Sequence, residues 1–530
     1  MAVSVPCSVG PPLSLPGLLF ADDGVTISDS ALHLAAALRR ISMWCDRWHM
    51  STNARKCGIM VVVPECALRR RVRKALLRDG VPGGADIRTI YDLIVGRMRG
   101  SMASELVLQG VSVPIVESYT YLGCLLDRRL SWPAMVADRA EKGRRALMAM
   151  APFLRNTAIP LHVRVTVFRG TVVRTCLYGA ELWGGSRSRL APIQRVVNSG
   201  LRLLVGCGMA SSMPSMFAVF RELSCAPVAA SALAARCRAF LKYPDLSTWI
   251  ATLIVRPPPR DVCAGTWVTP TQRLAAKCEA KPRILSKASR VHGVGQCDRL
   301  ELLEAVVYRV FAAEWASCED ANKSVTARGY REGAFVKTSM AAHSEFWLPT
   351  AGSSMVHLLR ARVGAFVTDS RAVHFGSGGA ADGGVCRFCD SGDVESLSHV
   401  LVRCSKWDPL RRSLLHGLLR EGVELLSAVH VPASLRASSE NLTTLLLGGA
   451  VSGVRLSAWA SPPDGASGVL EDDAASAAVS DDLSAVSTMS GVSSASGAVP
   501  GDFCFQLQGC YAVARFLERV SVLRRPGVVV

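Results

Sequence analysis

The first sixty residues of the chain alternate between short apolar runs and one amphipathic segment. Apolar runs at residues 18–20 and 25–27 flank an Asp-Asp-Gly triplet, which is the pattern of a tight β-hairpin. Apolar residues then recur at intervals of three and four, which predicts the buried face of a helix that Ser28, Asp29 or Ser30 caps. The residues of this face are Leu34, Leu38, Ile41, Cys45 and Trp48. A further apolar run at residues 58–63 predicts a strand, so the expected order is β–β–α–β.

The pattern changes twice farther along the chain. Apolar runs between residues 106 and 126 predict more hairpin-like strands, whereas helical spacing dominates from about residue 133 to 243 and again from 270 to 345. A basic helical run at residues 69–78 is either a solvated helix face or a contact to phosphate. Four prolines are expected to mark helix boundaries. They are Pro152, Pro160, Pro192 and Pro214.

Charge is spread unevenly over the 530 residues. The formal net charge is +18, but residues 451–503 form a Ser/Ala/Gly/Asp-rich segment with seven acidic residues and one basic residue. The rest of the chain therefore carries +24. Such a segment is expected to be disordered, and a body this basic favours a polyanionic partner. Charge alone leaves nucleic acid and an acidic membrane surface both open.

Cysteine use and hydropathy narrow the class of protein. The 18 cysteines are scattered along a long chain, which is typical of a reduced, intracellular protein. The first 20 residues contain no Lys or Arg and several prolines, so no signal peptide is expected. No apolar run reaches the ~18 residues that a membrane span needs. Secreted, disulfide-stapled and integral-membrane proteins are thereby excluded.

Two adjacent carboxylates, Asp22 and Asp23, lie at the tip of the predicted hairpin. Neighbouring like charges are costly unless a cation compensates them, and hard oxygen ligands suit Mg²⁺. Polymerases use such carboxylates to hold Mg²⁺ ions that align the attacking hydroxyl and the leaving pyrophosphate. An isolated Asp-Asp-Gly is most often an ordinary turn, so the assignment depends on the neighbouring motifs.

A Cys/His cluster lies in the C-terminal third, with the spacing C-x2-C-x9-H-x4-C. Its members are Cys386, Cys389, His399 and Cys404. Thiolate and imidazole ligands at this spacing predict a closed tetrahedral zinc site. Two roles stay open: a structural zinc that holds local helices, and direct contact with nucleic acid through nearby cations. Those cations are Arg403, Lys406, Arg411 and Arg412.

Three further motifs follow the hairpin in order. Residues 50–57 read Met-Ser-Thr-Asn-Ala-Arg-Lys-Cys, residues 118–127 read Ser-Tyr-Thr-Tyr-Leu-Gly-Cys-Leu-Leu-Asp, and residues 176–183 read Cys-Leu-Tyr-Gly-Ala-Glu-Leu-Trp. Together with Phe-Ala-Asp-Asp at residues 20–23, this ordered set resembles the reverse transcriptase of non-LTR (LINE-type) retrotransposons. The resemblance runs from about Pro16 to Phe240. It resumes at the Cys/His cluster, which looks like the family's C-terminal CCHC zinc knuckle with Glu395 in its usual place.

The resemblance implies catalytic and binding roles for particular residues. Asp22 and Asp23 look like the Mg²⁺-binding pair of the polymerase palm, and Lys56 like the lysine that lies near the triphosphate and assists pyrophosphate departure. The Tyr121-Leu122-Gly123 segment looks like the family's turn that grips the primer end. For Tyr121 and Trp183, plain core packing stays open beside the family role. The implied nucleotide- and primer-binding residues are Phe20, Asn53, Tyr121, Leu122 and Gly123.

The implied fold class is α+β: a partial polymerase palm (β-hairpin, helix, strand), a mostly helical thumb, and a helical C-terminal region with a zinc knuckle. The expected domains are a partial palm at 1–130 with a basic insertion near 65–104, a thumb at 131–255, a linker and helical connection at 256–350, a zinc-knuckle region at 351–450, a disordered segment at 451–503 and a terminal helix at 504–530. The implied cofactors are Mg²⁺ and structural Zn²⁺. The implied partners are an RNA template, a DNA primer or target and dNTPs, with no membrane. An intracellular and, by resemblance, nuclear location is expected.

One part of the family pattern is missing from the sequence. The family has a third palm carboxylate upstream of the Asp-Asp hairpin, but the 19 residues before Phe20 contain no Asp or Glu. The sequence therefore predicts the C-terminal portion of a longer reverse transcriptase, inactive alone because its two-metal site is incomplete. The alternative is a non-catalytic nucleic-acid-binding remnant that uses thumb and knuckle. A zinc-pinned helical scaffold, with the hairpin a coincidence, is the third possibility.

Overall fold

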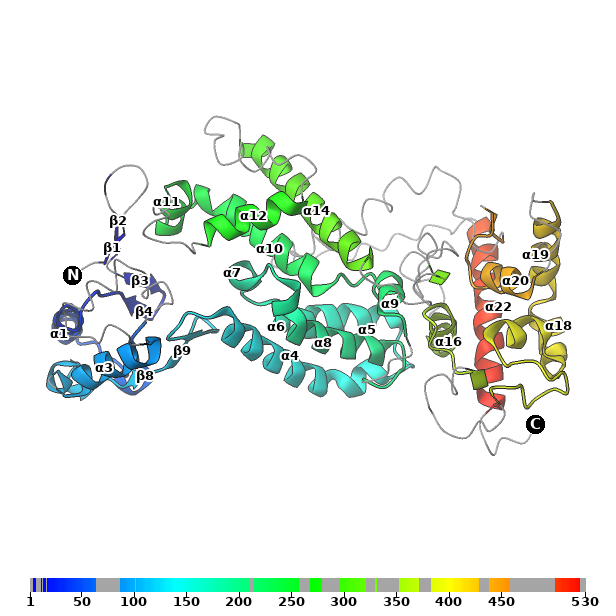
Figure 1. Ribbon diagram of the computed structural model, residues 1–530, viewed down its shortest axis with the longest axis horizontal. Coiled ribbons are helices and arrows are strands. Elements are labelled where there is room, and N and C mark those ends of the chain that lie inside the picture. The colour runs from blue at the N-terminus through cyan, green and yellow to red at the C-terminus, as the bar shows by residue number, and fades with distance from the viewer. Residues whose placement is uncertain are drawn as a thin grey trace. The chain divides into compact units, whose positions relative to one another are not determined.

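The computed structural model describes residues 3–5, 11, 13–15, 17–62, 86–100, 102–209, 214–256, 267–278, 296–320, 329–330, 352–370, 383–428, 438–452, 454–456 and 501–524. These residues form a mixed, mostly helical chain with a few small sheets (Figure 1). The chain divides into two compact units. The first comprises Met1–Glu141, Tyr178–Pro192 and Ala232–Phe311, and the second Lys142–Leu177, Ile193–Ser231 and Ala312–Val530.

All strands that the structure describes lie in the first unit and pair two by two. The strands are β1 (Val3–Val5), β2 (Leu13–Leu15), β3 (Gly17–Phe20), β4 (Asp23–Thr26), β5 (Ile59–Met60), β6 (Val107–Leu108), β7 (Val111–Ser112), β8 (Ile115–Val116), β9 (Ser118–Tyr121) and β10 (Cys124–Asp127). The pairs β3–β4, β6–β7 and β9–β10 are antiparallel, as the predicted hairpins require. The pair β1–β2 is also antiparallel and had no predicted counterpart. In contrast, β5 and β8 are parallel, with Ile59 opposite Ile115.

Helix α1 (Ala31–Arg47) forms where the apolar spacing predicts it. The Ser30 side chain caps its start by accepting a hydrogen bond from the His33 backbone N–H at 3.2 Å. Leu38 and Cys45 are buried in the expected face. The expectation is wrong for Trp48, which follows the last helical residue and is 62% exposed. Because the helix ends at Arg47, the chain leaves the helical path before Trp48 reaches the core.

The predicted thumb region is helical, but two of the helix boundaries predicted within it are wrong. Its helices are α4 (Trp132–Arg155), α5 (Leu161–Phe168), η4 (Arg169–Val173), α6 (Arg174–Leu177), α7 (Ala180–Trp183), α8 (Arg187–Leu204), α9 (Met216–Glu222), α10 (Val228–Lys242), η5 (Tyr243–Asp245) and α11 (Trp249–Val255). Pro160 does precede a helix, as the N-cap of α5. Pro152 and Pro192 instead lie inside α4 and α8. Their neighbours Leu154 and Ile193 are fully buried, and this packing outweighs the backbone hydrogen bond that each proline removes.

The remaining described elements complete the two units. In the first unit, residues of α10, α11, α12 (Val268–Cys278) and α14 (Gln296–Asp320) share one apolar cluster around Phe240 and Val310. Two further elements of that unit, α3 (Ile87–Gly100) and η3 (Ala103–Glu105), follow residues outside the described part. The short helix η1 (Ala54–Lys56) precedes β5.

The C-terminal part of the second unit surrounds the Cys/His cluster. Its elements are α16 (Gly352–Arg362), η9 (His399–Arg403), η10 (Ser405–Trp407), α18 (Asp408–Leu414), α19 (His416–Ala428), α20 (Ser439–Leu446) and α22 (Gly501–Leu523). Helix α22 packs on α16 and α18 through the fully buried Phe516, Leu517 and Val520 (Figure 1). The helix predicted at the C-terminus is therefore present, although it begins earlier than expected.

Several expectations lie outside the described residues. These are the basic run at residues 69–78, most of the proline-rich start of the linker and nearly all of the acidic segment. The division into six domains stays a prediction. Among the helices that the structure describes, none combines the length and apolar character that crossing a bilayer requires.

Candidate functional site

The two predicted catalytic aspartates lie at the tip of the β3–β4 hairpin. Phe20 pairs with Asp23, so Ala21 and Asp22 form a two-residue turn. Ala21 has a φ of 53°, the left-handed region that an alanine rarely adopts. Phe20 is 62% exposed, and both aspartates are exposed as well. A strained non-glycine residue beside exposed carboxylates is the kind of local geometry found at functional sites.

Asn53 directly precedes η1 and Lys56 is its last residue, and Gln109 holds this segment in place. The Gln109 side-chain oxygen accepts hydrogen bonds from the Thr52 backbone N–H and hydroxyl at 2.7 and 2.8 Å. Its amide nitrogen donates to Asp46 at 2.7 Å and to the Met50 carbonyl at 2.9 Å. Gln109 thus joins the β6–β7 turn to the end of α1 and to the chain before η1. No sequence motif indicates this residue, because its partners are about 60 positions away.

Tyr119 holds the backbone of the lysine segment. Its hydroxyl donates to the Lys56 carbonyl at 2.9 Å. Burial raises the pKa of Tyr119, and the nearby charges of Cys57 and Asp23 raise it further. The charge of Asp23 therefore acts on the residue that fixes Lys56. Among the described residues, no hydrogen bond or ion pair joins either aspartate directly to Asn53 or Lys56.

The donor set at the hairpin fits one Mg²⁺ better than two. Mg²⁺ is commonly held by one or two carboxylates together with phosphate oxygens of a substrate. Asp22 and Asp23 supply two carboxylates, but within the described part of the chain no third His, Cys or carboxylate joins them in a metal-binding group. Asp29 and Asp46 are engaged elsewhere, with His33 and Gln109. A second ion would need donors that these residues do not provide.

The predicted primer-gripping turn is held by Arg139 of α4 and by Tyr178, which lies between α6 and α7. Leu122 and Gly123 form the β9–β10 turn with φ values of 46° and 77°. The Tyr178 hydroxyl donates to the Leu122 carbonyl at 2.9 Å, and Arg139 donates to the Gly123 carbonyl. The Arg139 guanidinium also lies over the Tyr178 ring, 4.7 Å from its centre. Both carbonyls of the turn are thereby satisfied, and Tyr121 is half-buried beside it.

Replacing Gly123 by alanine is expected to destabilise this part of the first unit by about 1–3 kcal/mol. A Cβ at Gly123 would lie 3.3 Å from the Tyr178 ring in addition to the positive φ. Gly110 is a matched control, since it has the same φ of 77° but no atom within 4 Å of its Cβ position. Urea unfolding of both variants measures the difference. Equal losses would show that the Tyr178 contact contributes nothing.

The motif at residues 176–183 packs against the same turn. Gly179 has a φ of 79°, and a Cβ there would approach the Cys124 sulfur to 3.0 Å. Trp183 is fully buried, which agrees with core packing. Two sequence motifs that are 55 positions apart thus form one packed group with Arg139, which sequence analysis did not single out.

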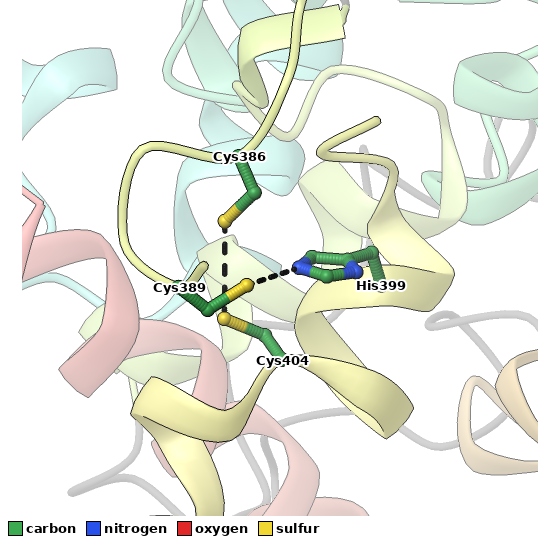
Figure 2. A group of neighbouring side chains, drawn as sticks. All are labelled: Cys386, Cys389, His399 and Cys404. Atoms are coloured by element: carbon green, nitrogen blue, oxygen red, sulfur yellow. Dashed lines mark hydrogen bonds between the residues drawn. The ribbon is translucent and has the colours of Figure 1, made fainter. Parts of the chain in front are cut away.

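The Cys/His cluster is the one group of three or more metal-binding side chains in the described part of the chain (Figure 2). The ligand atoms of Cys386, Cys389, His399 and Cys404 all lie within 4.8 Å of one another. The Cys386 and Cys404 sulfurs are 3.9 Å apart, and the Cys389 sulfur is 3.3 Å from His399 Nε2. Zinc–sulfur bonds of about 2.3 Å give a tetrahedron with edges of about 3.8 Å. The four side chains therefore fit a zinc ion with little movement.

Local backbone structure explains the spacing of the four ligands. Val385 and Val394 form an antiparallel bridge, and the Cys386 N–H donates to the Asp393 carbonyl at 2.8 Å. This closes the loop that carries the first two cysteines. The Cys404 N–H donates to the His399 carbonyl at 2.7 Å, one turn of π-helix. Five positions from His399 to Cys404 therefore place both side chains on the same side.

The surroundings of the cluster are suited to a bound cation. Burial raises the pKa of Cys404 to about 12, and it lowers the pKa of His399, so that the uncharged forms are favoured without a metal. The Asp393 carboxylate lies 3.5 Å from His399 Nδ1, on the opposite side of the ring from the cysteines. This placement leaves Nε2 for the metal. Arg411 donates to the Cys404 carbonyl, and the Phe388 and Trp407 rings pack 5.6 Å apart beside the loop.

Comparison with known proteins gives one partial match. Over 197 residues, 36% of the chain, the sequence is 27% identical to the "Probable RNA-directed DNA polymerase from transposon X-element" of Drosophila melanogaster. This partial similarity supports a reverse-transcriptase-like relationship. The matched part spans only 18% of that relative's length. No family model and no solved structure matches the chain.

The comparison and the geometry support different predictions. The match supports the reverse-transcriptase-like relationship that the ordered motifs predicted. The structure confirms that the four predicted zinc ligands converge. The roles of Asp22, Asp23 and Lys56, and of the nucleotide- and primer-binding residues, stay predictions.

Proposed function

We propose that this chain is a portion of the reverse transcriptase of a non-LTR retrotransposon, with a catalytic centre that is incomplete in this chain. The observation that carries the proposal is the hairpin with Asp22 and Asp23 exposed at a strained turn. The related transposon polymerase supports the same assignment. The palm, thumb and knuckle are parts of this proposal.

Each group has a chemical task in this proposal. Mg²⁺, when bound by Asp22 and Asp23 with triphosphate oxygens, would supply charge neutralisation at the nucleotide. The Lys56 ammonium would donate a proton to the departing pyrophosphate. Exposed Phe20 offers an apolar face to the nucleotide. The β9–β10 turn, fixed by Tyr178 and Arg139, presents a rigid edge to the primer.

A nucleic-acid-binding protein without polymerase chemistry is the second candidate. The +24 charge outside residues 451–503 favours it, since Lys and Arg contacts to phosphate supply sequence-independent affinity. In this candidate the zinc site and the helices bind RNA or DNA, and the aspartates are structural turn residues. Salt-dependent binding is expected for both candidates and does not separate them. A nuclear location belongs to both proposals.

Template-primed dNTP incorporation with Mg²⁺ separates the possibilities. We expect the unaltered chain to bind template–primer but to incorporate no more dNTP than the Asp22→Ala variant. Asp92→Ala, which removes an exposed carboxylate from α3, is the matched control. Robust incorporation that only Asp22→Ala abolishes would overturn the incomplete centre and establish the role of Asp22. Incorporation that survives Asp22→Ala would overturn the residue assignment.

A test of the missing part follows from the same assay. Adding a polymerase segment that supplies a third carboxylate is expected to restore incorporation with the unaltered chain and not with Asp22→Ala. Restoration with both would mean that the added segment carries the activity. Failure with both, together with retained binding, would favour the non-catalytic candidate.

A further inference from the structure

The end of the C-terminal helix reaches the candidate metal loop. Arg524, directly after α22, donates to the Glu395 carboxylate at 2.5 Å and to the Val367 carbonyl at 2.5 Å. Its guanidinium also lies 5.5 Å from the centre of the Phe388 ring. Phe388 stands between Cys386 and Cys389, so one arginine contacts both sides of the loop that carries the first two ligands.

Glu395 occupies the central position in this contact. Its side chain is fully buried, and its backbone N–H donates to the Gly384 carbonyl at 2.8 Å, next to the bridge that closes the metal loop. Burial raises the pKa of Glu395, whereas the charge of Arg524 lowers it. A buried carboxylate needs such a partner, because an unpaired charge in this environment is costly. The shape of the loop therefore depends on where Arg524 lies.

A second carboxylate extends the network to the other side of the loop. The Asp369 N–H donates to Glu395 at 2.7 Å, and its carboxylate accepts two hydrogen bonds from Arg387 at 2.8 and 2.7 Å. Arg387 directly follows the ligand Cys386. Arg524 is 3.7 Å from Asp369, so the two arginines and two carboxylates alternate around the loop.

The helix itself is well anchored. Five residues on one side of α22 are fully buried against the second unit, largely on α16 and α18. They are Val513, Ala514, Phe516, Leu517 and Val520. The position of Arg524 is therefore set by packing of the helix and not by the metal loop alone.

We propose that α22 supports the metal site. Arg524 is a positioning residue that holds the Cys386–Cys389 loop through Glu395. Docking of the helix and binding of the metal then stabilise each other. This coupling is reciprocal: whatever factor helix docking adds to metal affinity, metal binding adds to helix docking. The inference rests on the zinc site and not on polymerase activity, which is measured separately.

Zinc affinity of the full chain, measured by competition with a chromophoric chelator, tests the first half of the coupling. Arg524→Ala is expected to weaken zinc binding about 10- to 100-fold, the usual effect of losing a residue that orients metal ligands. Arg519→Ala removes an exposed arginine of the same helix and is expected to leave the affinity unchanged. Arg524→Lys keeps the charge but not the forked donor, so its zinc affinity is expected to lie between those of the unaltered chain and Arg524→Ala. Equal affinity for all variants would overturn the proposal.

Two further readouts distinguish positioning from a general loss of folding. The absorption of Co²⁺ bound in place of zinc reports ligand geometry, and we expect it to change in Arg524→Ala and not in Arg519→Ala. Chelation of zinc from the unaltered chain is expected to speed hydrogen exchange in residues 512–524. A lower thermal midpoint with unchanged cobalt spectrum and unchanged affinity would show that Arg524 is merely structural and would overturn the proposal. No zinc binding by the unaltered chain would overturn the metal site as well.

Discussion

Replacing Cys404 by serine is expected to weaken zinc binding by at least about 100-fold and to loosen the packing around the metal loop. Cys404 is fully buried and forms one edge of the ligand group with Cys386. A serine hydroxyl does not replace the thiolate, because its proton is far harder to displace. The three remaining ligands would leave one coordination position of the ion without a protein ligand.

A chelator competition assay measures the affinity, and hydrogen exchange of residues 383–407 reports the packing. Cys57→Ser is the control, since Cys57 lies in the first unit and belongs to no metal-binding group of the described residues. Its sulfhydryl donates to the Asn53 carbonyl at 3.4 Å, a bond that serine also makes. Unchanged zinc affinity in Cys404→Ser would show that the cluster is not a zinc site.

Replacing Arg362 by methionine is expected to destabilise the second unit by about 3–5 kcal/mol. Arg362 lies 2.8 Å from the Glu222 carboxylate, and both side chains are completely buried. Tyr330 also donates to Glu222, at 2.6 Å, and Arg362 donates to the Leu447 carbonyl at 2.9 Å. Without Arg362, the buried Glu222 carboxylate would lose the cation that compensates its charge.

Although burial opposes its charge, Glu222 and Tyr330 hold the pKa of Arg362 above its usual range. Arg362 therefore keeps its charge, and the stabilising effect of that charge is not lost as the pH rises through neutrality. Desolvation of the ions offsets much of their attraction. The double variant Glu222→Gln, Arg362→Met is therefore expected to lose less unfolding free energy than the single variant Arg362→Met.

Urea unfolding of the zinc-loaded chain, analysed as a double-mutant cycle, measures this coupling. The exposed pair Arg420–Glu424, separated by 3.7 Å on α19, is the matched control. Arg420→Met is expected to change stability by about 0.5 kcal/mol or less, because exposed ion pairs contribute little. If Arg362→Met behaved like Arg420→Met, the buried pair would not be a stabilising contact.

Local chemistry explains the features that the sequence predicted well. The β3–β4 hairpin and α1 depend on turn residues, apolar spacing and a Ser30 cap, all within a few positions of one another. The Cys/His cluster also closes locally, through a short loop and one π-turn that ends at Cys404. Such features can be predicted from the sequence because the interacting residues are neighbours in it.

Long-range packing explains the errors. Pro152 and Pro192 interrupt no helix, because buried neighbours hold α4 and α8 together across each proline. Trp48 leaves the predicted face because α1 ends one residue earlier. The run at residues 58–63 yields the short strand β5, which finds its partner β8 more than 50 positions later and in parallel. None of these outcomes has a local signal.

Sequence motifs are enough to predict the residues of the candidate chemistry: two aspartates at a turn, a lysine segment, a Tyr-Leu-Gly turn and four zinc ligands at regular spacing. The contacts that hold these residues in place come from the folded chain. Tyr119 fixes Lys56, Tyr178 and Arg139 fix the Gly123 turn, and Arg524 reaches the metal loop from the far end of the chain. Spacing encodes contacts along a turn, whereas a single hydrogen bond between distant residues leaves no pattern in one sequence.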